Sequence, residues 1–167
     1  MSALPPMSAV PPMRETPAVR AAGPEDAARV KEIAAAAYAR YVPRIGRPPA
    51  PMTADYDGAI GRAEVWVAAR AGRVVGFVVL VRRADHLLLE NVAADPADQG
   101  TGVGARLLAF AEEEAVAADL GEIRLYTHVT MTENQAYYPR HGYVETHRDN
   151  DEGFDRVFFR KRLDRAG

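Results

Sequence analysis

The feature that most constrains the fold is a glycine-rich segment, Gln99-Gly100-Thr101-Gly102-Val103-Gly104, between a predicted strand and a predicted helix. Glycine lets the backbone turn tightly and lets a ligand approach it with no side chain between. The first N–H groups of a helix have no partner within that helix and lie at its positive end. A phosphate or pyrophosphate is therefore the ligand expected on this segment.

Two other interpretations of the segment compete with a phosphate loop of this kind. One is a turn without a ligand, because glycines cluster in many turns. The other is a dinucleotide site, since Gly100, Gly102 and Ala105 fit the pattern GxGxxA and Glu122 follows about where a ribose-binding acid is expected. That fingerprint requires glycine directly after the strand, at the head of repeated βαβ units. Here five residues, Asp95 to Gln99, intervene after three predicted antiparallel strands, which disfavours the dinucleotide site.

The elements around the segment predict an α/β (α+β) fold with one mixed, mostly antiparallel sheet and helices on both faces. Strands are expected at 18–20, 65–68, 73–81, 86–94, 122–127, from 142 onward, and at 156–161. Helices are expected from 24 to before Pro43, from Thr53 or Asp55 to about 58–61, after 104, and from Thr130 or Thr132 to Arg140. The proline-rich stretch 43–51 predicts a stiff loop that is neither helix nor central strand, and 149–153 predicts a polar turn.

Length and composition restrict the classes of function. The 167 residues, 48% of them hydrophobic, suffice for one domain with a real core. The absence of cysteine excludes disulfides, thiolate nucleophiles and cysteine-bound metals. The four histidines lack HxxxH spacing, so no metal site is expected. A net charge of −2 gives no reason to expect nucleic acid as a partner.

The first 16 residues contain four prolines and predict a disordered leader, followed by one folded domain at 17–165. They lack a basic start followed by a long apolar run, so they do not predict a signal peptide. No apolar stretch approaches the roughly 18 residues that a membrane helix needs. We therefore expect a cytoplasmic protein that does not associate with membranes.

The segment 90–108 resembles the central motif of the GCN5-related N-acetyltransferases (GNAT family). Their signature is Gln or Arg, two residues, Gly, one residue, then Gly or Ala, and here Gln99, Gly102 and Gly104 match it. In element order the resemblance covers about 19–163. It implies a single GNAT-like domain that uses acetyl-CoA as co-substrate, without a metal. The acceptor it implies is an amine, on a small molecule or on a protein, and the family often forms homodimers.

The resemblance also implies which residues contact acetyl-CoA. The backbone N–H groups of the glycine-rich segment would cradle the pyrophosphate, and the preceding strand would pair with the pantetheine arm and hold the thioester. The residues expected to contact the co-substrate are Val92, Ala93, Ala94, Gln99, Gly100, Thr101, Gly102, Val103, Gly104, Ala105 and Asn134.

A second family signature follows the next strand and ends in Tyr-x-x-x-Gly-Phe. The chain has Tyr138 and Gly142 at these positions, with Tyr143 in place of the phenylalanine. The resemblance implies that Tyr138 lies near the CoA sulfur, where a phenol donates a proton to the leaving thiolate. An aromatic core position is the alternative. The chain departs from the pattern at Met131, where the family usually has Asn, and Asn134 falls where Ala is common.

The attacking amine must lose a proton, and Glu90 is the candidate base. Strand alternation predicts that Glu90, Val92 and Ala94 share one face, so that Glu90 points into the reaction groove and acts directly or through a water. A salt bridge or hydrogen bond to a neighbouring strand is the equally weighted alternative. Tyr126 and His128 are weaker candidates.

Two segments are expected to wall the acceptor side. The first is 41–56, where Arg44, Arg47, Met52 and Tyr56 would meet an acceptor, or where the arginines are only solvated. The second is the acidic stretch 148–155, which would attract a cationic amine or be a solvated turn. The two segments have opposite charge: the arginines would suit an anionic group on the acceptor, and the acidic stretch would suit a cationic one. The sequence therefore does not select one acceptor. A non-catalytic acyl-CoA-binding module remains the alternative function.

Overall fold

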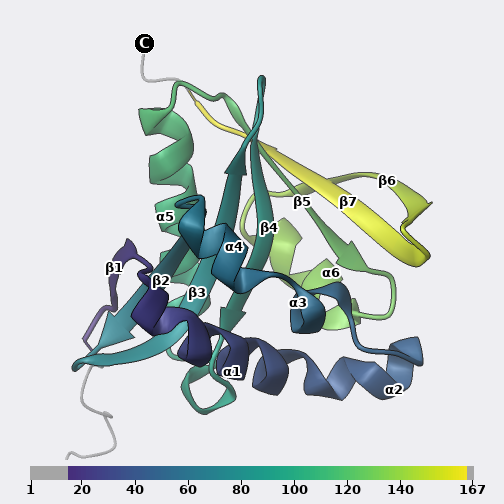
Figure 1. The fold of residues 1–167 in the computed structure, drawn as a ribbon. Helices are drawn as coiled ribbons and strands as arrows, with labels where there is room; N and C mark the ends of the chain where they lie inside the picture. Colours follow the sequence, from purple (N-terminus) through teal and green to yellow (C-terminus); the bar gives the residue numbers. More distant parts are fainter. Residues whose placement is uncertain (1–14, 165–167) are drawn as a thin grey trace, which may run out of the picture.

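The computed structural model describes residues 15–164, which fold into a seven-stranded sheet covered by helices on both faces (Figure 1). The predicted leader, 1–16, lies outside the described residues except for its last two. Along the sheet the order is β1-β2-β3-β4-β5-β7-β6, and β4 with β5 is the parallel pair among antiparallel neighbours. The strands are β1 (Ala18–Ala21), β2 (Val65–Arg70), β3 (Arg73–Arg82), β4 (Leu87–Ala94), β5 (Glu122–His128), β6 (Val144–Asp151) and β7 (Phe154–Arg162). The predicted mixed sheet is confirmed.

Helices α1, α3 and α4 belong to one face of the sheet, and α5 covers the other (Figure 1). The helices are α1 (Ala27–Tyr38), α2 (Val42–Ile45), α3 (Ala50–Thr53), α4 (Tyr56–Gly61), α5 (Val103–Ala117) and α6 (Thr132–Arg140), with the 3₁₀ turns η1 (Pro24–Asp26), η2 (Ala39–Tyr41) and η3 (Pro96–Asp98). Asp55 caps α4 by accepting a hydrogen bond from Gly58 N–H at 3.0 Å, as one of the two predicted caps.

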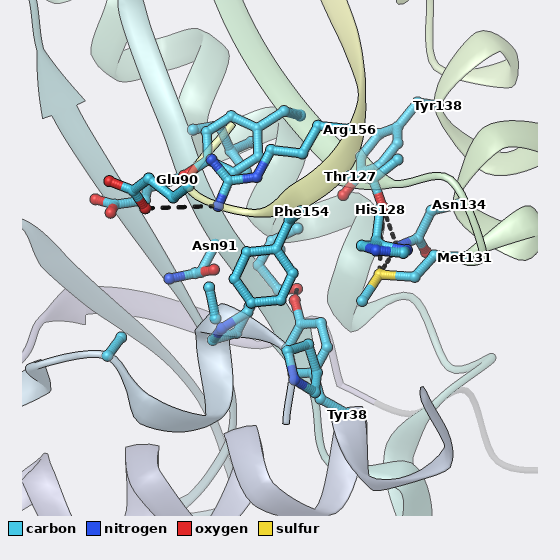
Figure 2. Close-up of a pocket in the computed structure, with 18 of the residues that line it drawn as sticks. Tyr38, Glu90, Asn91, Thr127, His128, Met131, Asn134, Tyr138, Phe154 and Arg156 are labelled. Carbon is cyan, nitrogen blue, oxygen red and sulfur yellow. Dashed lines mark hydrogen bonds and ion pairs between the residues drawn. The ribbon is translucent and has the colours of Figure 1, made fainter. Parts of the chain in front are cut away.

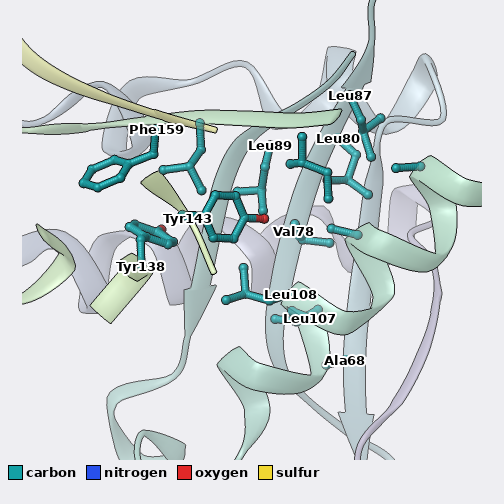
Figure 3. Packing of buried hydrophobic residues seen from close by; sticks show 14 of the residues in the cluster. Ala68, Val78, Leu80, Leu87, Leu89, Leu107, Leu108, Tyr138, Tyr143 and Phe159 are labelled. Atoms are coloured by element: carbon teal, nitrogen blue, oxygen red, sulfur yellow. The ribbon is translucent and has the colours of Figure 1, made fainter. Parts of the chain in front are cut away.

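The larger core lies between α5 and the sheet (Figure 3). On α5, Val103, Leu107, Ala111 and Ala115 recur every four residues and are all buried, so one apolar stripe faces the strands. Burying each of the larger side chains contributes about 1.5–3 kcal/mol. A Cβ at Gly76 of β3 would lie 2.7 Å from Val103 Cγ1, so this glycine permits the close approach of α5. The start of α5, and with it the glycine-rich segment, is thereby held against the sheet.

The prediction that 43–51 contains no helix is wrong. Pro43 lies in the first turn of α2 and Pro51 in the first turn of α3. A proline there loses no hydrogen bond, because the first N–H groups of a helix have no partner within it. Each helix is only four residues long, so the segment remains a set of short turns.

The predicted polar turn at 149–153 is also too long. Strand β6 continues to Asp151, and the turn consists of Glu152 and Gly153 with φ of 55° and 80°. Two left-handed residues match the twist of a tight hairpin. Polar composition misled the prediction because β6 is an edge strand whose eight residues are all exposed, where polar side chains are at no disadvantage.

Candidate active site

Strands β4 and β5 pair over only two positions and then separate. The parallel register joins Leu87 to Ile123 and Leu88 to Arg124. Beyond these pairs the carboxyl ends of the two strands diverge, and two cavities open there. We call them the loop-side cavity, bordered by the glycine-rich segment, and the hairpin-side cavity, bordered by the turn between β6 and β7.

The predicted orientation of Glu90 is wrong, because β4 contains a bulge at this residue. Leu89 pairs with Leu80 of β3, the next pair is Asn91 with Val79, and Glu90 between them is the extra residue. Leu89 and Val92 both pack on the α5 side, three residues apart, so strict alternation fails here. Glu90 therefore does not share a face with Val92 and Ala94. It still lines the hairpin-side cavity, because the bulge turns it toward the α1 side, within electrostatic reach of Tyr56.

The backbone of β4 presents polar groups to the opening. Asp95 N–H donates to Val75 O at 2.8 Å, so residues 95, 93 and 91 face β3, and Val92 and Ala94 face away from it. Beyond Leu88 no β5 partner is paired to this edge. The Tyr38 hydroxyl of α1 donates to Val92 O at 3.1 Å. An extended ligand can pair with this edge as a further strand would.

The loop-side cavity has a volume of about 490 Å³. Most residues predicted to contact acetyl-CoA lie on its wall: Val92, Ala93, Ala94, Gln99, Gly100, Gly102, Gly104, Ala105 and Asn134. Thr101 and Val103 do not. The Val103 side chain is buried in the core below α5, and the Thr101 hydroxyl donates to Asp98 O at 2.5 Å. Val103 can therefore meet a ligand only through its backbone N–H, and the Thr101 N–H, like its hydroxyl, already donates to Asp98 O.

The turn from the glycine-rich segment into α5 leaves the N–H groups of 103–105 available, whereas those of Gln99 and Thr101 donate to Pro96 O and Asp98 O. Gly100 and Gly102 have φ of 78° and 94°, the left-handed region that only glycine adopts without strain. The first helical hydrogen bond of α5 runs from Arg106 N–H to Gly102 O at 3.0 Å. The N–H groups of 103–105 precede that bond and have no acceptor within the helix. This is the geometry that binds a phosphate.

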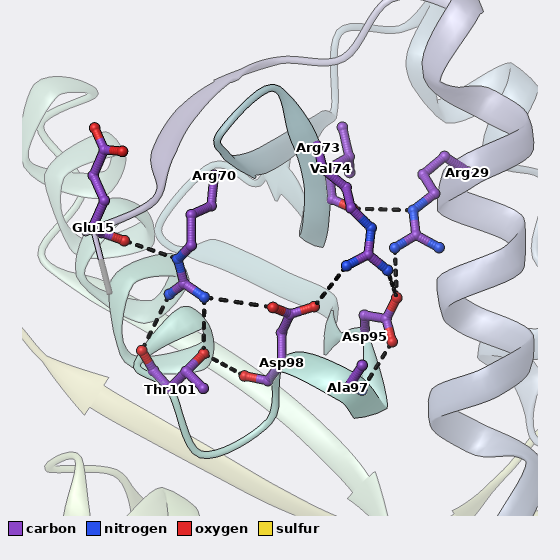
Figure 4. Close-up of polar contacts among 9 residues, drawn as sticks. All are labelled: Glu15, Arg29, Arg70, Arg73, Val74, Asp95, Ala97, Asp98 and Thr101. Atoms are coloured by element: carbon purple, nitrogen blue, oxygen red, sulfur yellow. Dashed lines mark hydrogen bonds and ion pairs between the residues drawn. The ribbon is translucent and has the colours of Figure 1, made fainter. Parts of the chain in front are cut away.

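A network of charged side chains holds the segment from behind (Figure 4). Arg70, at the end of β2, donates to Thr101 Oγ1 at 3.1 Å and to Thr101 O at 3.2 Å. Asp95 caps η3 by accepting from Ala97 N–H at 2.9 Å. It also pairs with Arg29 of α1 at 2.5 Å and with Arg73 of β3 at 3.0 Å. These bonds lower the pKa of Asp95, the Ala97 N–H first and Arg29 second.

This supporting network was not predicted. In the sequence, Arg70 and Arg73 flank a two-residue hairpin turn, Ala71-Gly72, and charged residues beside a turn are usually solvated. Their role depends on how the hairpin packs beside a loop that begins more than twenty residues later in the chain. The turn itself was predicted correctly, with φ of 52° and 78° at its two residues.

The hairpin-side cavity, of about 270 Å³, contains most of the chemically reactive side chains (Figure 2). Figure 2 shows Glu90 and Arg156 on one side and His128, Asn134 and Tyr138 on the other. Among the described residues, the Glu90 carboxylate makes no hydrogen bond or ion pair, so the predicted alternative of a bond to a neighbouring strand is not what the structure has.

Four residues line both cavities and mark their junction: Tyr38, Val92, Asn134 and Tyr138. Tyr138 is only 7% exposed, and burial raises its pKa well above the ordinary value of a phenol. Its hydroxyl makes no hydrogen bond within 15–164 and therefore stays available. At neutral pH this group is a protonated phenol between the two cavities. Tyr38 was not singled out from the sequence, where it lies among helical alanines.

Asn134 and Met131 occupy the positions where the sequence departs from the family signature. Asn134 Nδ2 donates to Thr127 Oγ1 at 3.1 Å. The buried Met131 accepts, through its sulfur, from Thr127 Oγ1 at 3.3 Å. Asn134 thus bonds a side chain of β5 rather than the local backbone, and it still lines both cavities.

The weaker base candidates have structural partners. Thr130 N–H donates to His128 Nδ1 at 3.1 Å, and burial lowers the pKa of His128 below 6.5. Tyr126 lies under the Arg156 guanidinium, whose centre is 4.2 Å from the ring centroid. Burial raises the pKa of Tyr126, so at neutral pH neither it nor His128 carries a charge.

The four residues predicted to meet an acceptor from 41–56 do not line the hairpin-side cavity. Tyr56 is buried and donates to Pro51 O at 2.5 Å. Arg44 binds Glu133 of α6, and Arg47 lies over Phe154. Met52 is partly buried on α3. From this segment the cavity wall is formed instead by Pro49, Ala50, Pro51, Ala54 and Asp55.

Two searches of the described residues gave negative results. Within 15–164 no group of three or more His, Asp or Glu side chains is arranged to hold a metal ion. No helix in that part of the chain is long and apolar enough to cross a membrane.

Comparisons with known proteins agree on one family. Residues 61–145 match the family model described as the acetyltransferase (GNAT) domain. No curated protein matches the sequence. Among solved structures, a GCN5-related N-acetyltransferase from Rhodopseudomonas palustris is 24% identical, with a TM-score of 0.72 over 90% of this chain and 98% of its own. The PaiA N-acetyltransferase of Thermoplasma acidophilum, solved with coenzyme A, is 18% identical with a TM-score of 0.75, over 89% of this chain and all of its own.

A third similar structure is the ribosomal-protein-S18-alanine N-acetyltransferase of Escherichia coli. It is 18% identical, with a TM-score of 0.73 over 90% of this chain and 96% of its own. At these identities the solved structures establish the fold, and the named acceptors belong to those proteins.

Proposed function

This chain belongs to the acetyltransferase (GNAT) family, and on that premise we propose that it transfers an acetyl group from acetyl-CoA to a primary amine. The observation that carries the proposal is the junction of the two cavities in the gap between β4 and β5. A phosphate loop borders one cavity, a free carboxylate lines the other, and a buried phenol lines both. Direct transfer requires the reacting groups of two bound substrates to lie side by side, and two cavities that meet allow this.

The loop-side cavity suits acetyl-CoA. The N–H groups at the start of α5 would bind the pyrophosphate, and the free edge of β4 at Val92 and Ala94 would pair with the amide groups of the pantetheine arm. With these contacts the thioester would lie near Val92, at the junction. Two similar structures, those of PaiA and of YncA from Salmonella typhimurium, contain coenzyme A and acetyl-CoA respectively, which supports the choice of co-substrate.

The residues at the junction have complementary roles in this proposal. Glu90 accepts a proton from the ammonium form of the acceptor, directly or through a water, and the freed lone pair attacks the thioester carbonyl. The Val92 N–H stabilises the negative charge that develops on the carbonyl oxygen. As the carbon–sulfur bond breaks, Tyr138 donates its proton to the thiolate, and the attacking nitrogen loses its second proton to the phenolate, which restores Tyr138. The products are an amide and CoA, and no covalent enzyme intermediate forms.

The experiment that tests this function measures free thiol released from acetyl-CoA in the presence of a panel of amines. Wild-type protein is expected to release thiol with at least one primary amine. Tyr138→Phe is expected to lower kcat by at least about a hundredfold, the usual contribution of a general acid. Unchanged turnover would remove Tyr138 from this role. Acetyl-CoA binding without thiol release for any amine would favour a non-catalytic acyl-CoA-binding module.

Tyr143→Phe is the matched control. Tyr143 packs against Tyr138 with ring centroids 5.7 Å apart, and its buried hydroxyl has no hydrogen-bond partner in the described part of the chain. It lines neither cavity. Removing an unsatisfied buried hydroxyl is close to neutral for stability, so this variant is expected to keep wild-type kcat.

A further inference from the structure

The arginines near the hairpin-side cavity are already bound to other groups. Arg44 binds Glu133 of α6 through two hydrogen bonds of 2.8 and 2.9 Å. Arg47 donates to Gly153 O at 2.6 Å, with its guanidinium 3.7 Å from the Phe154 ring centroid. Neither arginine lines the cavity. The basic wall expected from the sequence is therefore unavailable to an anionic acceptor.

Arg156 lines the cavity, but its positive charge is also paired with carboxylates of the protein. Its guanidinium is 2.6 Å from an Asp151 carboxylate oxygen and 3.9 Å from one of Glu152, and it lies over the Tyr126 ring. The side chain is nearly fully buried. A buried arginine with these partners has little capacity to bind a carboxylate or phosphate on the acceptor.

The carboxylates of Glu90 and Asp55, on the wall of the same cavity, have fewer positively charged partners than Arg156 has negative ones. Glu90 makes no ion pair or hydrogen bond within 15–164. Asp55 accepts one hydrogen bond, from the backbone of α4. The Arg62 guanidinium lies within electrostatic reach of both, but it pairs with Glu64 at 2.7 Å. Since His128 is neutral at pH 7, the described lining carries a net negative charge.

The rest of the wall suits the body of a small aliphatic cation. A guanidinium already lies over each of the Tyr126 and Phe154 rings, so these rings, together with Pro49 and Pro51, line the cavity as apolar surface for the carbon chain. The unpartnered hydroxyl of the buried Tyr138 shows that the cavity also contains a polar group without an internal partner. The Arg47 contacts join the 41–56 segment to the turn between β6 and β7 at the edge of this volume.

We propose that the acceptor is a small aliphatic amine with a second cationic group, of which an alkyl diamine is the simplest example. One ammonium would lie at Glu90 and lose its proton there, and the other would lie toward Asp55. This inference rests on the proposed acetyl transfer and specifies its acceptor. Neither carboxylate belongs to the acidic stretch 148–155 expected from the sequence, because Asp151 and Glu152 of that stretch pair with Arg156. Asp55 lies in 41–56, the segment that was expected to form the basic wall, and Glu90 lies on β4.

The test compares three acceptors with the same four-carbon chain: a diamine, an amino alcohol and an amino acid. With acetyl-CoA fixed, kcat/KM from thiol release is expected to be highest for the diamine and lowest for the amino acid, with steps of about tenfold. A peptide with a free N-terminus is the fourth arm and is expected to be a poor acceptor.

Asp55→Asn tests the second cation site. Asparagine also caps helices, so α4 keeps its N-cap and only the charge is lost. The ratio of kcat/KM for the diamine to that for the amino alcohol is expected to fall from about ten toward one. Asp57→Asn is the control, because Asp57 lies two residues away on α4, pairs with Lys31 and does not line the cavity. It is expected to keep the wild-type ratio.

The outcomes separate this inference from the proposed function. Thiol release that is fastest with the amino acid or the peptide, or a ratio unaffected by Asp55→Asn, would overturn the cationic acceptor while leaving acetyl transfer intact. If the protein binds acetyl-CoA but releases no thiol with any of the amines, both the cationic acceptor and the proposed acetyl transfer are overturned.

Discussion

At the residue scale, Tyr38 couples helix α1 to the edge of the sheet that the proposal assigns to the thioester. Its hydroxyl donates to Val92 O, and the side chain lines both cavities. The N–H of Val92 belongs to the same short stretch of β4 backbone. A hydrogen bond on the carbonyl restrains the orientation of that stretch, which makes Tyr38 a positioning residue.

Tyr38→Phe removes only this hydrogen bond. We expect kcat to fall about tenfold, equivalent to ~1.4 kcal/mol of barrier, with little change in KM for acetyl-CoA, which depends mainly on the phosphate loop. Steady-state kinetics with free-thiol detection measures both constants. A change in KM alone, or in neither constant, would contradict the positioning role.

Residues of the candidate site could be predicted where a short sequence motif contains them, and not where their position depends on the fold. The glycines of the loop and Tyr138 follow from motifs read directly in the sequence. Glu90 was chosen because it is a carboxylate on a central strand, but the argument about its face was wrong because a bulge adds one residue. Tyr38 gave no signal, since an aromatic residue at helical spacing is usually a core residue.

At the element scale, Asp95 joins three pieces of secondary structure. It caps η3 and forms ion pairs with α1 and β3, just before the glycine-rich segment. These contacts lower its pKa below the ordinary 3.8. Between the folded-state pKa of Asp95 and its ordinary pKa, the unfolded state binds more protons than the folded state. The contribution of Asp95 to the free energy of unfolding is therefore complete above about pH 4 and is lost as the pH falls through the folded-state pKa.

Asp95→Asn keeps the cap and removes the charge. At pH 7 we expect it to lower the free energy of unfolding by about 1.5 kcal/mol, the low end for hydrogen bonds to charged groups, because Arg73 is largely exposed. The difference from wild type is expected to shrink as the pH falls toward 3. Urea unfolding at both pH values measures this. A difference that stays constant between pH 7 and pH 3 would show that the ion pairs are not its cause. Asp57→Asn, on an exposed ion pair, is expected to change little.

Element types were easier to predict than their ends. The apolar stripe of α5 and the β2–β3 hairpin turn have strong local patterns, and both are confirmed. The two short helices in 42–53 were missed because proline was taken as excluding a helix, although it is tolerated in a first turn. The end of β6 was missed because its edge position leaves no apolar alternation to detect.

At the scale of the whole molecule, element order and sheet class were predictable, and the opening between β4 and β5 was not. The order follows from periodicity and turn residues, and the resemblance to the GNAT family agrees with it. The opening depends on two parallel strands that pair at only two positions, together with the bulge in β4. Such a register is set by packing across the sheet, on both faces at once. The cavities exist only at this scale.

The central claim is that the loop at this opening binds the pyrophosphate of acetyl-CoA, and calorimetric titration with CoA tests it most directly. Wild-type protein is expected to bind one CoA. Gly102→Ala forces a side chain into a left-handed conformation and points a methyl group into the open space of the loop, so its Kd is expected to rise at least about tenfold. Gly46→Ala imposes similar strain at φ 85°, away from the loop, and is expected to bind like wild type. No binding by wild type, or equal binding by Gly102→Ala, would contradict the account.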